Sequence, residues 1–525
     1  MTEPEGTPEA KQPSILLSLI PVVVLIGLLA LNVRIFKSGD NQVSLILATA
    51  VAAVVARFGL GRSWEDLEKG VLQAIGQAMQ AVLILMVIGM LVAAWIKAGI
   101  VPILISYGLK TISPSVFLLT SCLVCCVIAL ATGSSWMTAG SVGVALMGIG
   151  RTMGFDPGMV AGAIVSGSYF GDKMSPLSDT TNLAPAMAGA TLFEHVKHMV
   201  WTVTPALVIS LGLYLFLGGE HSPGPDAMTR IDATVKLLEA NFASSPLLLL
   251  PPLLVIALII KKFPAVPALL FGTISAVVIG LAAPPPGAAL AAETARAAAI
   301  AEAGTTALDR LAELQLYWKP CADYFAALFS GYTLELPVKA PAGVLPEAAA
   351  AAVESVTSLL DGKGGMKSMM GTVAIVFCAM SFGGVMERSG MLASLANGLL
   401  SFVRGTGSLV LVTISTCIGI NVLASDQYMA IVVPGRMYRT AFLRRGLHPK
   451  NLSRCLEDAG TLTSPLVPWN TCGAQMTAVL GVLTWSYAPY AFLCYLCPVV
   501  SVVYGFTGFS MERITDEEAE RRIAE

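Results

Sequence analysis

Long apolar runs separated by short polar stretches set the pattern of this chain. The first run covers Ile15–Leu31, and runs of similar length follow at residues 42–58, 77–96 (after an amphipathic connector at 64–76) and 196–217. A helix needs about 20 apolar residues to cross the hydrocarbon core of a bilayer. The pattern therefore predicts an all-α polytopic membrane protein. Further runs in the second half lie at residues 246–260, 264–281, 368–386 and 487–509.

One polar stretch interrupts an apolar segment in the first half. Residues 158–188 are expected to be helical, but residues 171–185 hold two carboxylates, a lysine, two serines, two threonines and an asparagine. Pro176 and Pro185 argue against a continuous helix there. Lipid leaves free backbone groups unsatisfied, so such a stretch must be buried in protein or line a watery cavity. This position makes it a candidate binding site.

Three other apolar segments have polar centres. Residues 113–150 are broken near the sequence Gly133, Ser134, Ser135 and Trp136, and could form two full spans or one re-entrant hairpin. The small hydroxyl residues favour the hairpin, with these four at its tip, because they suit a tip buried against other helices. Residues 408–440, with a polar centre at 421–427, are interpreted in the same way. Residues 457–483 are predicted to form a second broken helix.

An internal repeat relates these interruptions. The sequence Ser175-Pro176-Leu177 recurs as Ser464-Pro465-Leu466, and 464 − 175 gives an offset of 289. The same offset places Trp136 on Ser425, and Thr181-Asn182 on Asn470-Thr471. Polar interruptions in the same order at one offset predict two structural repeats. We assign the repeats to residues 14–217 and 246–509, joined by a polar loop at 218–245 and with an extramembrane, partly helical insert at 284–365.

The distribution of basic residues indicates that the two repeats are inverted. Residues 436–454 carry six Lys and Arg residues, whereas the equivalent residues 147–165 carry only Arg151. Basic residues near span ends mark the cytoplasmic side. We therefore expect ten spans and two hairpins in the plasma (bacterial inner) membrane. The tails at residues 1–13, expected to be disordered, and 510–525 would both be cytoplasmic, and the insert would lie outside.

Composition supports the membrane class and changes little else. Hydrophobic residues make up 55% of the 525, and charged residues only 13%, about half the share in a soluble chain. The sequence has no basic run that would indicate a nucleic-acid partner. The first apolar run lacks a small-residue cleavage site, so we interpret it as a transmembrane helix and not as a signal peptide.

The polar breaks can bind a cation. Ends of half-helices carry partial charge, Asp172 and Asp179 add full negative charge, and hard cations take oxygen ligands. Burial raises the pKa of a carboxyl group, so a proton competes with the cation for it. These properties are the minimal machinery of a cation/proton antiporter. The predicted cation- and proton-binding residues are Asp172, Asp179, Asp426, Ser175, Thr180, Thr181, Asn182, Asn421, Ser425, Asn470 and Thr471.

Some of these residues also have simpler interpretations. Asp179 could cap a half-helix, and Asp172 could form a structural ion pair with Lys173. Glu387 could be a second proton carrier, although a surface charge pair between Glu387 and Arg388 is the simpler interpretation. Intramembrane charges are rare without a role, which favours function for the two charges of the first break.

Four motifs of the sequence are distinctive: residues 171–189, Thr132-Gly133-Ser134-Ser135-Trp136, Phe382-Gly383-Gly384-Val385-Met386-Glu387 and residues 460–470. These motifs resemble those of the NhaC-type Na⁺/H⁺ antiporters. The resemblance covers nearly the whole chain except residues 284–365, and it implies paired hairpins, a scaffold with a mobile transport domain, and often a homodimer. It implies Na⁺ and H⁺ as transported ions, with no cofactor and no other metal.

Two other functions compete with Na⁺/H⁺ antiport. The resembling family also includes malate/lactate exchangers, so the substrate could be a small carboxylate, with Lys173 as its anion contact. An intramembrane aspartyl protease would also use two carboxylates. The sequence has Tyr-Phe-Gly-Asp at 169–172 but no Gly-x-Gly-Asp, and proteolysis would leave the repeat unexplained. The absence of a Walker-A sequence argues against an ATP-driven pump.

Overall fold

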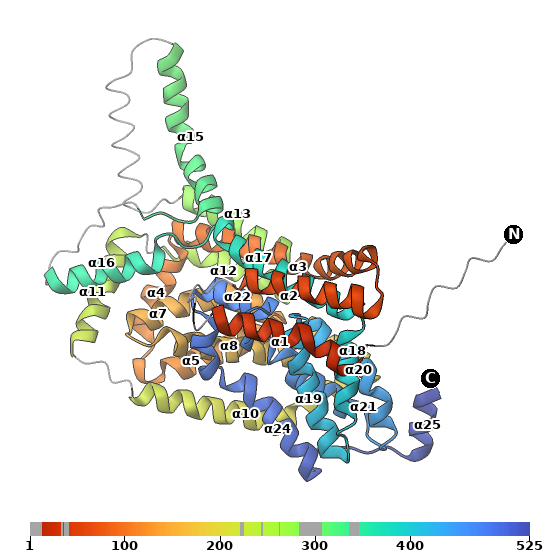
Figure 1. Ribbon diagram of the computed structural model, residues 1–525. Helices are drawn as coiled ribbons and strands as arrows, with labels where there is room; N and C mark the ends of the chain where they lie inside the picture. Colours follow the sequence, from red (N-terminus) through yellow and green to blue (C-terminus); the bar gives the residue numbers. More distant parts are fainter. Residues whose placement is uncertain are drawn as a thin grey trace.

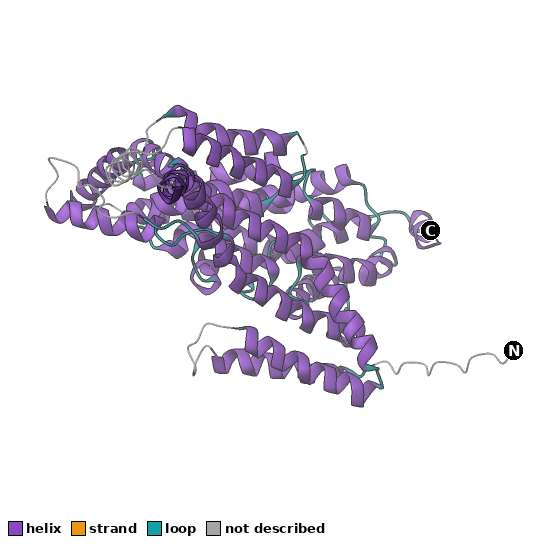
Figure 2. Cartoon of the chain, turned by 90° about the horizontal axis from the view of Figure 1, so that it is seen from above, coloured by secondary structure: helices purple, strands orange, loops and turns teal. Residues whose placement is uncertain are grey.

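The molecule is a bundle of helices (Figure 1). The computed structural model describes residues 13–32, 35, 41–220, 225–242, 245–261, 263–282, 307–334 and 346–524. Most of the predicted N-terminal tail and parts of the 284–365 insert lie outside these residues. Figure 2 shows the described part as helices joined by loops, which agrees with the all-α prediction.

The first three helices follow the predicted apolar runs, with one difference. Helix α1 covers Ile15–Leu31, and α2 covers Gln42–Val54 and continues as a π-helical turn, Val55–Gly59. The predicted connector and third span form a single helix, α3, of 34 residues at Trp64–Lys97. Ser63 starts this helix by accepting a hydrogen bond from the Asp66 backbone N–H, so the connector is its capped first turns.

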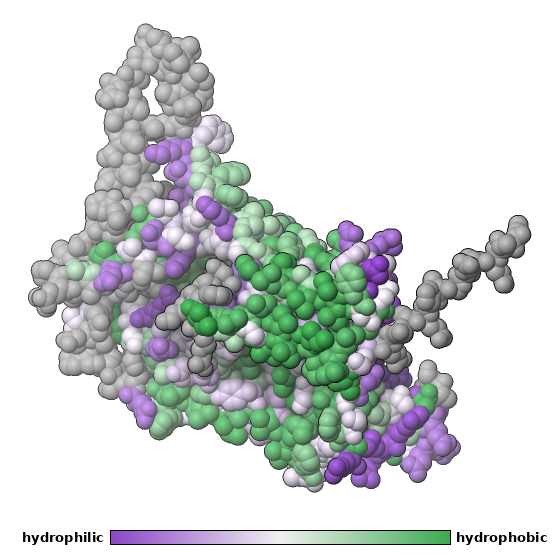
Figure 3. Space-filling model, viewed as in Figure 1, coloured by the Kyte–Doolittle hydropathy of each residue, from purple (hydrophilic) through white to green (hydrophobic). Residues whose placement is uncertain are grey.

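Six helices in the described residues are long and apolar enough to cross a membrane, or up to eight if each bent pair is one span. Hydrophobic residues gather on the surface over α1, and hydrophilic ones lie near the C-terminus (Figure 3). Ten spans remain a prediction. The six helical segments are Gln42–Gly59, Trp64–Lys97, Pro114–Thr132, Leu192–Glu220, Met366–Arg388 and Thr406–Leu423.

The first predicted hairpin reverses where the sequence indicated. Helix α5, Phe117–Thr132, ends at Gly133, whose φ of +70° is a left-handed conformation that glycine adopts without strain. The chain then returns to the start of α5, because the Phe117 and Phe155 ring centroids lie 5.4 Å apart. The returning arm consists of α6 (Ser135–Thr138), a π-helical turn (Ala139–Gly143) and α7 (Val144–Thr152).

The second predicted hairpin has the same form. Helix α19, Thr406–Leu423, and helix α20, Gln427–Leu443, pack against each other, and the Thr416 and Tyr438 hydroxyls are 2.5 Å apart. Ser425 lies at the tip with a φ of 58°, which is unusual for a residue with a side chain. Both predicted tips therefore join antiparallel helices, while their depth in the membrane remains a prediction.

Each hairpin is followed by a broken helix. Helix α8, Pro157–Met174, stops before an extended break, and α9 follows at Asp179–Ala188. In the second half, α21 (Pro449–Leu456) continues as a π-helical turn (Glu457–Thr461) and a short 3₁₀ turn (Ser464–Leu466) before α22, Thr471–Leu480.

The two second half-helices match, but not at the predicted offset. Both have ten residues and end at a left-handed glycine, Gly189 and Gly481. Their starts differ by 471 − 179, or 292, so the distance from the shared Ser-Pro-Leu sequence to the second half-helix is three residues longer in the second half. The predicted alignment of Thr181-Asn182 with Asn470-Thr471 is therefore wrong. The order of elements recurs in the two halves, and their inverted orientation remains a prediction.

The polar loop predicted at residues 218–245 contains a helix, α11, Pro225–Asn241. Its buried side chains Ile231, Val235 and Leu238 recur at helical spacing, and Glu239 forms an ion pair with Lys110. This apolar face was too short to stand out from the polar residues around it. The predicted insert is partly helical, as expected, with α15 at Ala307–Ser330 and α16 at Pro346–Leu360.

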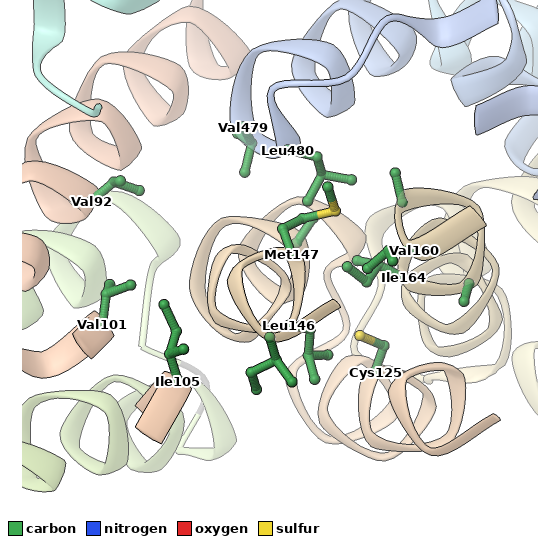
Figure 4. Packing of buried hydrophobic residues seen from close by; sticks show 14 of the residues in the cluster. Val92, Val101, Ile105, Cys125, Leu146, Met147, Val160, Ile164, Val479 and Leu480 are labelled. Carbon is green, nitrogen blue, oxygen red and sulfur yellow. The ribbon is translucent and has the colours of Figure 1, made fainter. Parts of the chain in front are cut away.

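The remaining helices surround the hairpins and broken helices. In Figure 4, Met147 of α7 lies beside Leu480 of α22, and Leu146 lies on the other side of α7 toward Cys125 of α5, so elements of both halves share one hydrophobic core. The remaining helices are α4 (Ile100–Thr111), α10 (Leu192–Glu220), α12 (Leu250–Ile260), α13 (Ala265–Ala282), α17 (Met370–Arg388), α18 (Met391–Leu400), α23 (Thr484–Tyr487), α24 (Phe492–Thr507) and α25 (Asp516–Ala524).

Candidate functional site

The first hairpin tip packs directly against the first break. A Cβ atom added to Gly133 would lie 2.7 Å from the backbone carbon of Leu177, so the tip approaches the break as closely as a glycine allows. The second tip and break are also joined, because the Thr471 N–H donates to the Ser425 carbonyl over 3.0 Å. Tips and breaks that are distant in sequence therefore form two local sites.

Asp172 is the centre of the first of these sites. Its side chain is buried, and its two carboxylate oxygens accept hydrogen bonds of 2.6 Å from the hydroxyls of Ser135 and Ser178. Thr181 donates to the backbone carbonyls of Asp172 and Lys173. The carboxylate thus joins the hairpin tip to the break, and the two backbone carbonyls join the end of α8 to α9.

Lys173 forms an ion pair with Asp458 that crosses from the first broken helix to the second. Both side chains are fully buried. The Thr202 hydroxyl of α10 donates a 3.0 Å hydrogen bond to the same Asp458 oxygen. The structural ion pair between Asp172 and Lys173, considered as the simpler alternative, is not formed, and Lys173 is paired instead with a residue 285 positions away in sequence.

Glu457 and Asp458 are candidate site residues that the sequence analysis did not identify. Both are fully buried, and neither Glu457 carboxylate oxygen has a hydrogen-bond partner in the described residues. Glu457 lies beside the Thr461 and Thr180 hydroxyls and faces Lys173 and Asp172. The available signal was two adjacent acids directly before the second break, in a segment otherwise rich in small and apolar residues.

The second site is held together by amides. Asn421 donates to the Gly460 carbonyl over 2.8 Å and to the Thr463 hydroxyl over 3.0 Å, and Asn470 donates back to Asn421. Asp426 is buried, but its carboxylate caps α20 by accepting from the Met429 N–H. Asp426 therefore lies at the second tip, and its recorded hydrogen bond is to its own helix.

The other predicted residues line the breaks in different ways. Ser175 accepts from the Leu177 N–H, Thr180 is buried, and Asn182 closes the turn by donating to the carbonyls of Pro176 and Ser178. Asp179 is exposed, with the Tyr428 hydroxyl 3.5 Å away. Ser134 caps the arm that begins at Ser135, Trp136 is partly buried beside it, and Thr471 donates to Asn470.

Glu387 does not belong to this buried group. Its side chain is exposed at the end of α17. The predicted charge pair between Glu387 and Arg388 is absent from the ion pairs of the described residues, because the Arg388 guanidinium lies 2.7 Å from Asp66 of α3. The acidic residue that anchors this arginine comes from the capped start of the long helix.

The site offers carboxylate, hydroxyl and carbonyl oxygens in place of a cluster of metal ligands. In the part of the chain that the structure describes, no three His, Cys, Asp or Glu side chains converge as they would around a metal ion. Ligands of this kind suit a hard monovalent cation or a proton.

Sequence comparison decides the family. The sequence model of the Na⁺/H⁺ antiporter family matches residues 167–301 and 328–509, which include both breaks. The chain belongs to the Na⁺/H⁺ antiporter family. The Na⁺/H⁺ antiporter NhaC of Alkalihalophilus pseudofirmus is 33% identical over 501 residues, which cover 95% of this chain and 97% of that protein. The resemblance noted from the motifs is thereby confirmed.

Antiporters of other substrates are similar to this member of the family. The arginine/ornithine antiporter ArcD of Halobacterium salinarum is 35% identical over 517 residues, covering 98% of this chain and 96% of that protein. The malate-2H⁺/Na⁺-lactate antiporter of Bacillus subtilis is 29% identical over 494 residues, covering 94% and 95%. The chain is thus a multi-pass membrane transporter and not an enzyme, which excludes the protease interpretation.

Proposed function

We propose that this protein exchanges Na⁺ for H⁺, and that both compete for buried carboxylates. The excess of buried acid carries this proposal. Asp172, Glu457 and Asp458 are 8%, 0% and 0% exposed, and the one buried lysine of the described residues, Lys173, is paired with Asp458. Three acids and one lysine would leave two uncompensated negative charges if all were ionised. Burying charge without a partner is costly, so the group requires cations or protons.

Asp172 is the group that we assign to the exchange. Its two hydroxyl partners come from the hairpin tip and from the break, so movement of either element changes its surroundings. A cation bound among these oxygens needs the ionised carboxylate, and a proton on the carboxylate removes that charge. An empty, ionised carrier would have to carry a bare charge through the membrane. Reorientation is therefore restricted to the loaded protein, which couples the two ions.

Alternating access would follow from movement of the broken helices as one unit. The Lys173–Asp458 pair and the contact between Asp179 and Tyr428 tie elements of the two halves together. Helices α3 and α17, joined by the Asp66–Arg388 ion pair, would form part of the scaffold. Rigid-body motion around a fixed central site is the usual route in repeat-based transporters. We also propose that the protein is a homodimer, as the resemblance of its motifs implies.

The same excess of acid favours a cationic substrate over an anionic one. Lys173, the expected anion contact, is engaged by Asp458, and a carboxylate substrate would have to displace that partner. The buried Lys and Arg side chains of the described residues are Lys173 and Arg454, and Arg454 donates to Ser510. A cationic amino acid, named for one relative, is therefore the second candidate substrate, ahead of malate and lactate.

Flux in proteoliposomes tests the proposal. Purified protein is reconstituted with a pH-sensitive dye inside, and Na⁺, or malate with lactate, is added outside. We expect proton movement with Na⁺ alone and none with the Asp172→Asn variant. Exchange of arginine for ornithine moves no proton, so it is measured separately, as uptake of radioactive L-arginine into vesicles loaded with L-ornithine. Such uptake without a dye response to Na⁺ would establish the second candidate. A response only to malate or lactate would contradict both cation proposals.

A further inference from the structure

We propose that the π-helical turn Glu457–Thr461 contains a binding site for an alkali cation, formed by the Glu457 carboxylate with the Thr461 and Thr180 hydroxyls. The inference rests on the proposed function in taking Na⁺ as the substrate. It adds a site in the second broken helix, and the carboxylate of that site, Glu457, lies outside the motifs and the hairpin tips.

Unpartnered oxygen atoms carry this inference. Both Glu457 carboxylate oxygens and the Thr461 hydroxyl are buried without a hydrogen-bond partner in the described residues. Buried polar groups nearly always have partners, and exceptions call for an explanation such as an ion. Glu457 lies beside both threonine hydroxyls. Three neighbouring oxygens with free lone pairs are the ligand type that hard cations take.

The local helix geometry brings two of these ligands to one face. Glu457 and Thr461 are four residues apart, and residues at this spacing lie one above the other on a helix. The turn that holds them is π-helical, a widened form found frequently at functional sites. Thr180 reaches the same place from the first turns of α9, so a bound cation would join the two broken helices.

The charges around Glu457 do not compensate its negative charge, so a bound cation is favoured there. The charged groups that face Glu457 are Lys173 and Asp172, both from α8. Lys173 is already paired with Asp458, and Thr202 supports that carboxylate. Cys497 of α24 and His195 of α10 lie near Lys173. Among the ion pairs of the described residues, none involves Glu457 or Asp172.

The internal repeat is a second observation that supports a site at Glu457 and Thr461. The offset of 289 at this part of the break relates Asp172 to Thr461, because 172 + 289 is 461, and relates Ser168 to Glu457. Each broken helix therefore holds one acid and one hydroxyl residue four positions apart, with their order exchanged. In the first half the acid is nearer the break, and in the second it lies one turn earlier.

Sodium binding to purified protein tests the site. Radioactive Na⁺ binding and Na⁺-dependent thermal stabilisation are measured in alkaline buffer, where proton competition is weakest. Glu457→Gln should weaken Na⁺ binding at least about tenfold, as expected when a charged ligand is lost. Thr461→Val should also weaken binding, with no change of charge. Glu517→Gln, an exposed residue of α25, is the matched control and should bind like the unmodified protein.

The outcomes separate this site from the proposed function. Wild-type Na⁺ affinity in Glu457→Gln would overturn the site and leave Na⁺/H⁺ exchange at Asp172 intact. If Glu457→Gln does not fold, wild-type affinity in both Thr461→Val and Thr180→Val overturns the site. Failure of the unmodified protein to bind or exchange Na⁺ would overturn the proposed function, and the site with it.

Discussion

The buried ion pair between Lys173 and Asp458 allows a quantitative prediction. Both side chains have 0% exposure, so removing one partner leaves the other charge enclosed without compensation. Losses of this kind cost about 3–5 kcal/mol. We therefore expect Asp458→Asn and Lys173→Met each to lower the free energy of unfolding by about that amount. The double variant should recover most of the loss, because it leaves neither charge behind.

Reversible unfolding in mixed detergent and denaturant micelles measures these free energies. The control is the Lys110–Glu239 pair, whose side chains are 47% and 40% exposed. Exposed pairs contribute about 0–1 kcal/mol, so Lys110→Met should change little. The double-mutant cycle isolates the coupling between Lys173 and Asp458. Additive effects of the two single variants, or a cost of Asp458→Asn similar to the control, would refute this account of the pair.

Three further predictions concern other parts of the molecule. Asp426→Asn should abolish or strongly weaken transport yet leave stability nearly unchanged. The reason is that asparagine can still cap α20 by accepting a hydrogen bond from the Met429 backbone N–H. Normal flux in this variant would show that Asp426 is structural. The loop at residues 444–450 should be cytoplasmic, and the loop at residues 151–157 should be extracellular. Single cysteines in each loop, labelled from one side of sealed vesicles, test this. Labelling of both loops from the same side would contradict inverted repeats. Burial lowers the pKa of His448, in the 444–450 loop, below its ordinary 6.5. The folded protein then binds fewer protons at His448 than the unfolded protein, so its stability should fall as the pH drops below about 6.5. The fall should be smaller in His448→Asn, which keeps a capping side chain. Identical thermal unfolding profiles of the unmodified protein and this variant between pH 5 and pH 8, roughly the range of histidine titration, would contradict this prediction.

Much of the fold could be predicted from apolar runs and their interruptions. The run at Ile15–Leu31 is the helix α1, and the reversals after Gly133 and at Ser425 occur where small polar residues break apolar segments. Helix α11 was missed because its apolar face is one short stripe among charged residues. Hydrophobic periodicity identifies a helix only when the apolar face is long enough to be distinguished from chance variation in residue type along the chain.

The part of the candidate site formed by the first hairpin tip and the first break was predictable, and the part formed by the second broken helix was not. Asp172 and Ser135 were both identified, because their polar stretches interrupt apolar segments, and the structure brings them into contact. Asp458 and Glu457 were overlooked because the sequence does not show that they are buried. The partners of Asp458 come from α8 and α10, and a contact across 285 residues depends on packing of the whole bundle.

The central claim is that cation and proton compete for a buried carboxylate. The most direct measurement is the apparent Na⁺ affinity of the purified protein as a function of pH. Below the pKa of the responsible carboxyl, each unit of added acidity should weaken Na⁺ binding about tenfold for each proton displaced. Asp172→Asn should remove the Na⁺ binding at this carboxylate and its pH dependence together. An affinity that stays flat from about pH 5 to about pH 9, a window that covers a carboxyl group shifted by burial, would contradict the account.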